Sequence, residues 1–215
     1  MINDFLDLLK EDIVSTIEGL IGIAPEVSLK EQTDAIGDLI PPLADIEVEI
    51  SGDATGKMRF LITPQSATAL GDMMLAGEGE EKDSMDDEDL DAIKEIVSNI
   101  LGSLSTALTA QPDLPKLSFS VTNASFKTEE DSDWVANVYK VVYDFAINGK
   151  DYDWIVLFDS NIYRKLNSDS SGGDSSSDST ENRNVANSGG GSIHSEFEAE
   201  EIKNLKLLLD VKLNL

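Results

Sequence analysis

The feature that most constrains the fold is an order of predicted elements that occurs twice in residues 1–167. The first copy begins with a helix over roughly residues 3–20, whose apolar side chains recur at helical spacing. Strands are predicted over residues 26–30, 46–50 and 57–63. Thr63 as N-cap and Pro64 at the first helical position then predict a second helix to residue 75.

The second copy follows the same order. A long helix is predicted over residues 89–110, and a short one over 161–166 is capped by Asp159 or Ser160. Between these helices lie three predicted strands, over residues 116–126, 134–147 and 153–158. An internal repeat of this size predicts a pseudo-two-fold α+β domain, with one antiparallel sheet covered by helices and repeats at about 1–77 and 84–167.

Charge excludes several classes of partner. The chain has 42 acidic and 16 basic residues, a net charge of −26, so nucleic acids and anionic membrane surfaces would repel it. It has no cysteine and one histidine, His194, which excludes disulfides, cysteine nucleophiles and multi-histidine metal sites. We therefore expect no cofactor and no metal. Neither a signal peptide nor a stretch of about 20 apolar residues is present, which favours a cytoplasmic location without membrane insertion.

Composition changes abruptly after the repeats. Residues 168–195 hold Ser, Gly, Asp or Asn at 21 of 28 positions, which predicts a flexible linker spanning roughly 30 Å. Residues 196–215 are apolar again, and from Leu209 they alternate with period two, which predicts a strand. A single strand cannot bury itself. We expect this tail either to be the start of a second module or to pair with a partner.

The predicted helix over residues 89–110 has two contrasting faces. One arc holds apolar side chains, namely Ile93, Ile96, Val97, Ile100, Leu101, Leu104 and Leu108. The opposite side holds Asp91, Glu95 and Ser98, with Asn99 at its flank, and Glu95 is close enough in register to contact Ser98 or Asn99. Two interpretations stay open: an ordinary solvated face, or a face that carries out chemistry or binds a partner.

This polar face resembles the signature of the CheC/CheX/FliY family, which comprises phosphatases of the chemotaxis response regulator and related flagellar switch proteins. That signature is Asp or Ser, three residues, Glu, two residues, Asn. Asp91 and Glu95 match it, whereas Ser98 occupies the Asn position and Asn99 follows one residue later. In the first repeat, Glu18 is the weaker candidate, because Ile21 stands at the Asn position.

The resemblance implies a chemistry and a set of partners. In the family, Asn holds a water in line with the phosphorus of an aspartyl phosphate, and Glu orients the regulator. Here Glu95 would take the second role, with Asn99 or Ser98 in the first. A structural role, without catalysis, would instead join the chain to switch subunits of the FliM, FliN and FliG type. We expect the switch role, with phosphatase activity towards the phosphorylated response regulator as the alternative.

The tail is similar to the opening of the FliN/SpoA module, which commonly begins with a Leu-rich segment, Asp-Val and an alternating strand. A CheC-like domain over 1–167, a linker and a truncated FliN-like start over 196–215 together resemble FliY proteins, in particular those of the Helicobacter and Campylobacter group. This implies a location at the cytoplasmic face of the flagellar basal body.

Two further features have plain interpretations. Residues 78–91 hold nine acids and one lysine, and acids before a helix favour its N-terminus, although they could also attract a basic partner. Asp87 and Asp91 could serve hydrolysis in an enzyme unrelated to this family, but acids within a charge run are usually solvated.

Overall fold

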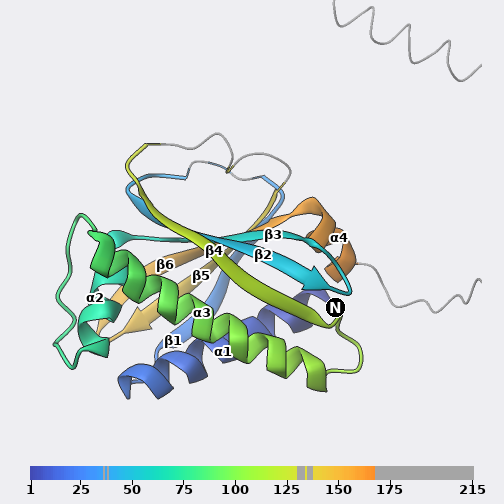
Figure 1. Ribbon diagram of the computed structural model, residues 1–215, viewed down its shortest axis with the longest axis horizontal. Coiled ribbons are helices and arrows are strands. Elements are labelled where there is room, and N and C mark those ends of the chain that lie inside the picture. Colours follow the sequence, from blue (N-terminus) through green and yellow to red (C-terminus); the bar gives the residue numbers. More distant parts are fainter. Residues whose placement is uncertain (36, 38, 130–133, 135–137, 168–215) are drawn as a thin grey trace, which may run out of the picture. The chain divides into compact units, whose positions relative to one another are not determined.

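The computed structural model describes residues 1–167, except residues 36, 38, 130–133 and 135–137. The predicted linker and the tail over 196–215 lie outside the described residues. In the described part, a sheet of six strands is covered on one face by helices (Figure 1). The helices are α1 (Ile2–Ile21), α2 (Pro64–Met74), α3 (Asp87–Ala110) and α4 (Ser160–Asn167). The strands are β1 (Glu26–Thr33), β2 (Leu43–Gly52), β3 (Gly56–Ile62), β4 (Leu117–Lys127), β5 (Val138–Ile147) and β6 (Lys150–Asp159).

The strand order β1-β5-β6-β3-β2-β4 confirms the predicted pseudo-two-fold α+β fold. Exchanging β1 with β4, β2 with β5 and β3 with β6 turns this order into its own reverse. The pseudo-axis passes between the two central strands, β3 and β6, where Phe60 lies opposite Val156. Each repeat also gives its first strand to the hairpin of the other, because β1 pairs with β5 and β4 pairs with β2. Neither repeat can therefore complete its half of the sheet alone.

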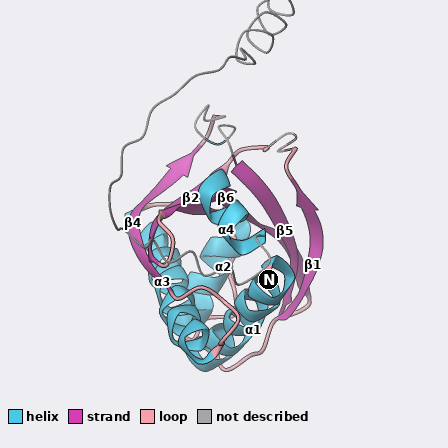
Figure 2. Cartoon of the chain, turned by 90° about the vertical axis from the view of Figure 1, so that its right-hand side faces the viewer, coloured by secondary structure: helices cyan, strands magenta, loops and turns pink. Residues whose placement is uncertain are grey.

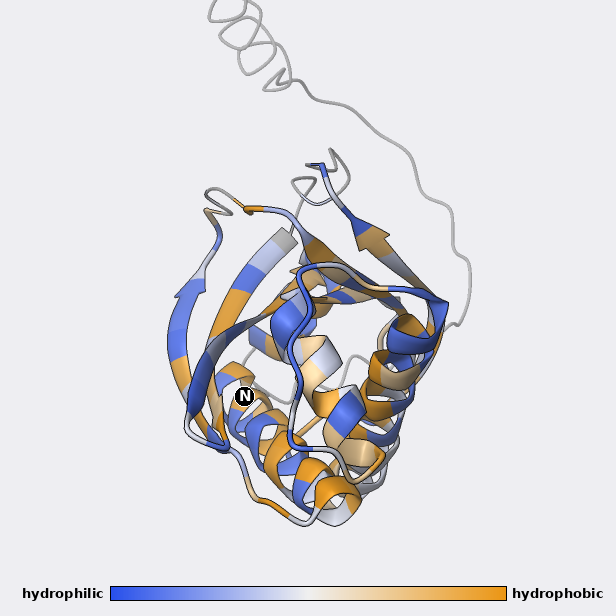
Figure 3. Cartoon of the chain, turned by 90° about the vertical axis from the view of Figure 1, so that its left-hand side faces the viewer, coloured by the Kyte–Doolittle hydropathy of each residue, from blue (hydrophilic) through white to orange (hydrophobic). Residues whose placement is uncertain are grey.

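The core lies between the sheet and the helices, which gather on the concave side of the sheet (Figure 2). Alternate strand residues point into it, such as Ile46, Val48 and Ile50 on β2. Hydrophobic residues also form stripes along α1 and α3 (Figure 3). Those of α3 that are buried are the seven that its helical periodicity predicts: Ile93, Ile96, Val97, Ile100, Leu101, Leu104 and Leu108.

Helix caps lie where the sequence places them. Thr63 Oγ1 accepts a hydrogen bond from Ser66 N at 3.4 Å, with Pro64 beginning α2. At α4, the Asp159 side chain accepts from Asn161 N at 3.0 Å and from Ile162 N at 2.9 Å, so Asp159 is the capping residue. These contacts satisfy donors that the first turn of a helix leaves without partners.

A second, smaller cluster lies apart from the main core and contains Leu39, Leu43, Leu61, Trp134 and Leu157. The expected strand over 134–147 is corrected here, since β5 begins at Val138 and Trp134 precedes it. Trp134 is 1% exposed and its Nε1 donates to Asp45 Oδ2 at 3.0 Å. Asp45 itself is fully buried and accepts from Arg59 Nη1 at 2.7 Å. This ion pair anchors Trp134 on β2 and β3.

Candidate functional site

The polar side of α3 is exposed, as its spacing predicts. Asp91, Glu95, Ser98 and Asn99 all face solvent, opposite the buried arc of the same helix. Together these four residues form what we call the α3 strip. The strip lies on the exposed side of a helix, and none of its four residues lines either of two pockets in the described part of the chain. Such a surface suits contact with a folded partner better than enclosure of a small molecule.

Within the α3 strip, the Ser98 hydroxyl is already engaged. Its Oγ donates to the carbonyl oxygen of Lys94, one turn earlier, at 2.7 Å. This is the position at which the family signature carries an amide. Ser98 is shorter than Asn and is turned towards its own helix. Asn99 supplies an exposed amide, but at 100° around the helix axis from Ser98.

The burial pattern establishes which residues of the two repeats correspond. On α1 the buried residues are Phe5, Leu6, Leu9, Asp12, Ile13 and Ile17. Adding 91 to each of these residue numbers gives six positions on α3: Ile96, Val97, Ile100, Ser103, Leu104 and Leu108. Five of these are buried, and Ser103 is half-buried. Asp12 and Ser103, a corresponding pair, also contact each other, since Ser103 Oγ donates to Asp12 Oδ1 at 2.5 Å. This contact places the crossing of α1 and α3 near the pseudo-axis.

This correspondence separates Glu18 from Glu95. Glu18 is exposed in the last turn of α1, where its carbonyl oxygen accepts from Gly22 N at 2.7 Å, and it corresponds to Thr109. The residue that corresponds to Glu95 is Asp4. Glu95, Ser98 and Asn99 thus lie together on α3. Glu18 does not occupy the position on α1 that corresponds to Glu95. A functional role for Glu18 stays a prediction.

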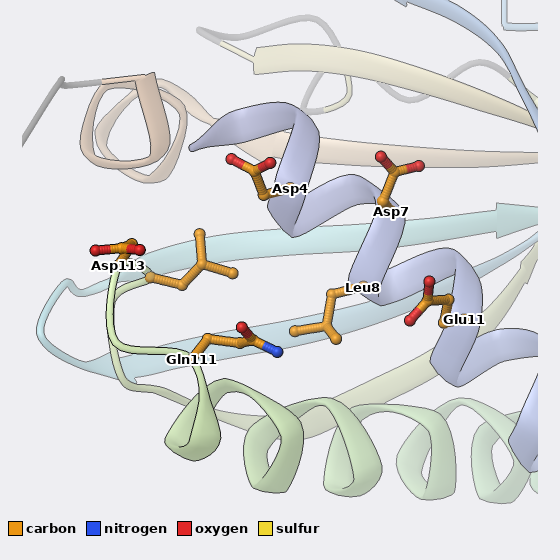
Figure 4. Close-up of a pocket in the computed structure, with 7 residues that line it drawn as sticks. Asp4, Asp7, Leu8, Glu11, Gln111 and Asp113 are labelled. Atoms are coloured by element: carbon orange, nitrogen blue, oxygen red, sulfur yellow. The ribbon is translucent and has the colours of Figure 1, made fainter.

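On α1, Asp4 and Asp7, the counterparts of Glu95 and Ser98, border a pocket of about 400 Å³ (Figure 4). Asp4, Asp7 and Glu11 lie on successive turns of α1, and Asp113 faces them from the segment after α3. The remaining lining residues are Leu8, Gln111 and Leu114. Among the described residues, no group of three or more acidic or histidine side chains has the arrangement that holds a metal ion. The two helix faces therefore differ in chemistry despite the symmetry of the fold.

Asp12 and Asp45 are two buried carboxylates. Asp12 is 7% exposed, and its burial raises the pKa of the carboxyl above the ordinary range, against the opposing effect of the Ser103 hydroxyl. Burial likewise raises the pKa of Asp45, although Trp134 and Arg59 favour its charged form. Asp12 Oδ2 and Asp45 Oδ1 are buried and accept no hydrogen bond from the described residues. Neither Asp12 nor Asp45 is one of the four residues of the α3 strip, and each is held by contacts inside the fold.

The acidic run before α3 acts as a cap. Asp86 accepts from Asp89 N at 3.0 Å while its own N–H donates to Asp89 Oδ2 at 3.1 Å, a reciprocal capping box. The hydrogen bond from Asp89 N lowers the pKa of Asp86. Lys82 adds an ion pair to Asp89 at 2.8 Å. These contacts support the interpretation of the acidic run as a helix cap.

None of the helices in the described part of the chain is long and apolar enough to span a membrane.

Comparison with known proteins places this geometry in context. No protein-family model matches the sequence, and no curated protein sequence matches it significantly. Several solved structures do match. FliY of Thermotoga maritima superposes with a TM-score of 0.68 over 77% of this chain and 91% of its own, at 16% identity. A structure of the FliG–FliM complex from H. pylori gives a TM-score of 0.64 over 77% and 94%, at 15% identity.

The fold is therefore one that FliY and FliM domains of flagellar proteins also have. The FliM middle domain from H. pylori shares it as well, with a TM-score of 0.62 over 76% of this chain and 92% of that domain, at 13% identity. At these identities the likeness concerns the fold alone.

Proposed function

We propose that this chain is a FliY-type component of the flagellar motor switch, which acts by binding other switch subunits. The observation that supports this most is the combination of a fold shared with FliY and FliM domains and a motif whose amide position holds Ser98, with its hydroxyl bonded to Lys94. Assembly into a ring of subunits needs surfaces and does not need a water-positioning amide. A degenerate motif is thus compatible with this role.

The proposed partners are switch subunits of the FliG, FliM and FliN type. A FliM domain with this fold has been crystallised with FliG, which supports FliG as the partner to test first. The location follows from the partners, at the cytoplasmic face of the basal body. The tail over 196–215 would belong to a FliN/SpoA-type module, tethered by the linker over 168–195.

Binding to the FliG-type protein of the same organism tests this role. Isothermal titration of the full chain with that protein should give saturable binding with a defined stoichiometry. A variant with Glu95→Ala and Asn99→Ala should bind equally well, because the switch role places no catalytic demand on these residues. Absence of binding to FliG-, FliM- and FliN-type proteins alike would refute the proposal.

A second function is favoured by one observation, the exposure of Glu95 and Asn99 on neighbouring turns of α3. In this alternative, the chain dephosphorylates the chemotaxis response regulator. Glu95 would hold the regulator, Asn99 would orient a water, and attack at phosphorus would break the bond to the aspartyl oxygen and release inorganic phosphate. An acyl phosphate is already activated, so no strong base is needed.

The decay of the acyl phosphate on the regulator tests the alternative. Faster decay with the natural chain, lost on Glu95→Ala and on Asn99→Ala, would establish hydrolysis at the α3 strip. Unchanged decay with a folded chain would refute it and would leave the switch role untouched, because the two experiments have independent readouts.

A further inference from the structure

The two edges of the sheet differ in a way that the proposed function does not explain. β1 and β4 each have one strand partner in the described part of the chain, β5 and β2 respectively, so both present a free edge (Figures 1 and 2). A free edge directs unpaired N–H and C=O groups outward, and proteins commonly blunt it with charged side chains. β1 is blunted in this way by Glu26, Lys30 and Glu31.

β4 is not blunted by charge. Over ten successive residues, Leu117 to Phe126, it carries no charged side chain and no proline, in a chain of which 27% is charged. A bulge interrupts its pairing with β2 near Thr122, which leaves the segment 117–121 in regular register. The carbonyl oxygen of Leu117 already accepts from Ser105 Oγ of α3 at 3.2 Å, so the rest of this segment is the template for a further strand.

The side chains on the two faces of this segment are also distinct. On the helix side, Phe119 and Val121 pack against the core but stay half-exposed, and no strand of the described residues lies beyond β4. On the other side, Ser118 and Ser120 are exposed and small. Ser120 lies directly opposite Glu49 of β2, which is exposed as well. A long cation on an added strand could pass over Ser120 towards this carboxylate.

We propose that the outer edge of β4 is a docking site for an extended segment of a partner chain in which apolar and basic residues alternate. The apolar side chains would cover Phe119 and Val121, and the basic ones would lie over Ser118 and Ser120. The net charge of −26 attracts such a segment from a distance. It also repels a second copy of this chain, so pairing of β4 with β4 is not the expected use of the edge.

The test uses the full chain and a dye-labelled nine-residue peptide of alternating valine and lysine. Anisotropy should show binding, and exchange of the amide hydrogens that face away from β2 within residues 117–121 should slow about tenfold when the peptide is bound. The control peptide has the same sequence with N-methyl groups along one edge, so that it keeps its charge but cannot pair as a strand. It should bind about tenfold more weakly.

Two variants locate the site. Val121→Lys places a cation on the half-exposed inner side of β4 and should weaken peptide binding about tenfold. Thr106→Lys adds the same charge on the exposed side of α3 and should change binding less than about threefold. Circular dichroism checks that each variant is folded. If Val121→Lys does not fold, Ser120→Lys takes its place in the test, because Ser120 is exposed.

Three results would overturn the proposal. The first is no binding of the alternating peptide, and the second is equal binding of the N-methylated peptide, which would mean attraction by charge alone. The third is a dimer in sedimentation equilibrium whose residues 117–121 are already protected without peptide. That result would make a second copy the occupant.

Discussion

Replacing Ser98 with asparagine is the perturbation that best separates the two functions of the α3 strip. Ser98 holds the position of the family amide, and its hydroxyl is bonded to Lys94 O at 2.7 Å. The amide that the chain does possess, on Asn99, starts from a Cα atom about 3.8 Å away and points about 100° around the helix. A misplacement of about 1 Å can cost about 100-fold in rate. Ser98→Asn should therefore accelerate acyl-phosphate decay about 100-fold more than the natural chain does.

The assay measures loss of labelled phosphate from the response regulator with equal amounts of natural chain and variant. Ser98 is exposed and within a helix, where Ser and Asn have similar propensities, so the free energy of unfolding should change by less than about 0.5 kcal/mol. Glu95→Ala in the Ser98→Asn background should remove the gain. The reasoning is refuted if the folded Ser98→Asn variant is no faster than the natural chain, or if Asn99→Ala removes a large activity that the natural chain already has.

Other predictions concern the groups that hold the fold. Arg59→Met leaves Asp45 buried without its cation and should lower the free energy of unfolding by about 3 kcal/mol at pH 7 in urea; the deficit should shrink at lower pH, and equal deficits at pH 4 and 7 would contradict this. Because burial raises the pKa of Asp12 in the folded state, its contribution to stability is full below the ordinary carboxyl range and lost as pH rises through the raised value. The stability of the natural chain relative to Asp12→Asn should thus be greater at pH 4 than at pH 7, and the opposite trend would show that Asp12 is stabilised as a carboxylate. Leu104→Ala should lower the free energy of unfolding by about 2–5 kcal/mol, and Thr106→Ala, on the exposed side of α3, by less than about 0.5 kcal/mol. Similar losses for both variants would contradict the assignment of the buried face of α3.

Local patterns predicted the elements because each has its signal within a few residues. The sequence predicted the strand over 46–50, in which Ile46 and Val48 prove to be buried, and the Thr63–Pro64 pair predicted the start of α2. Strand pairing has no such signal. Glu26 of β1 lies opposite Ala146 of β5, far along the chain, and only the assembled sheet determines that the repeats exchange their first strands.

The candidate site was predicted in part. Glu95, Ser98 and Asn99 share a face of one helix, and helical periodicity alone is enough to bring them together. The first repeat was aligned by its glutamate, Glu18, whereas the apolar spacing of α1 against α3 gives a different correspondence, with Asp4. That signal was present in the sequence.

Asp45 shows what local patterns cannot predict. A charged residue that alternates with apolar ones in a strand is expected on a solvated face. Here that face is covered locally, because Trp134 packs on it from the connection between β4 and β5 and donates to Asp45. Burial of this kind depends on a contact between residues far apart in sequence, so it emerges only from the assembled fold.

The measurement that most directly tests a structural role in the switch is motor rotation in cells that lack the natural chain and express a Glu95→Ala, Asn99→Ala variant. If the chain acts by assembly, the variant restores rotating motors and their rate of reversal to the level of the natural chain. Motors that assemble but no longer reverse normally, with phosphorylated regulator accumulating in the cell, would contradict that account and would show that the α3 strip performs catalysis.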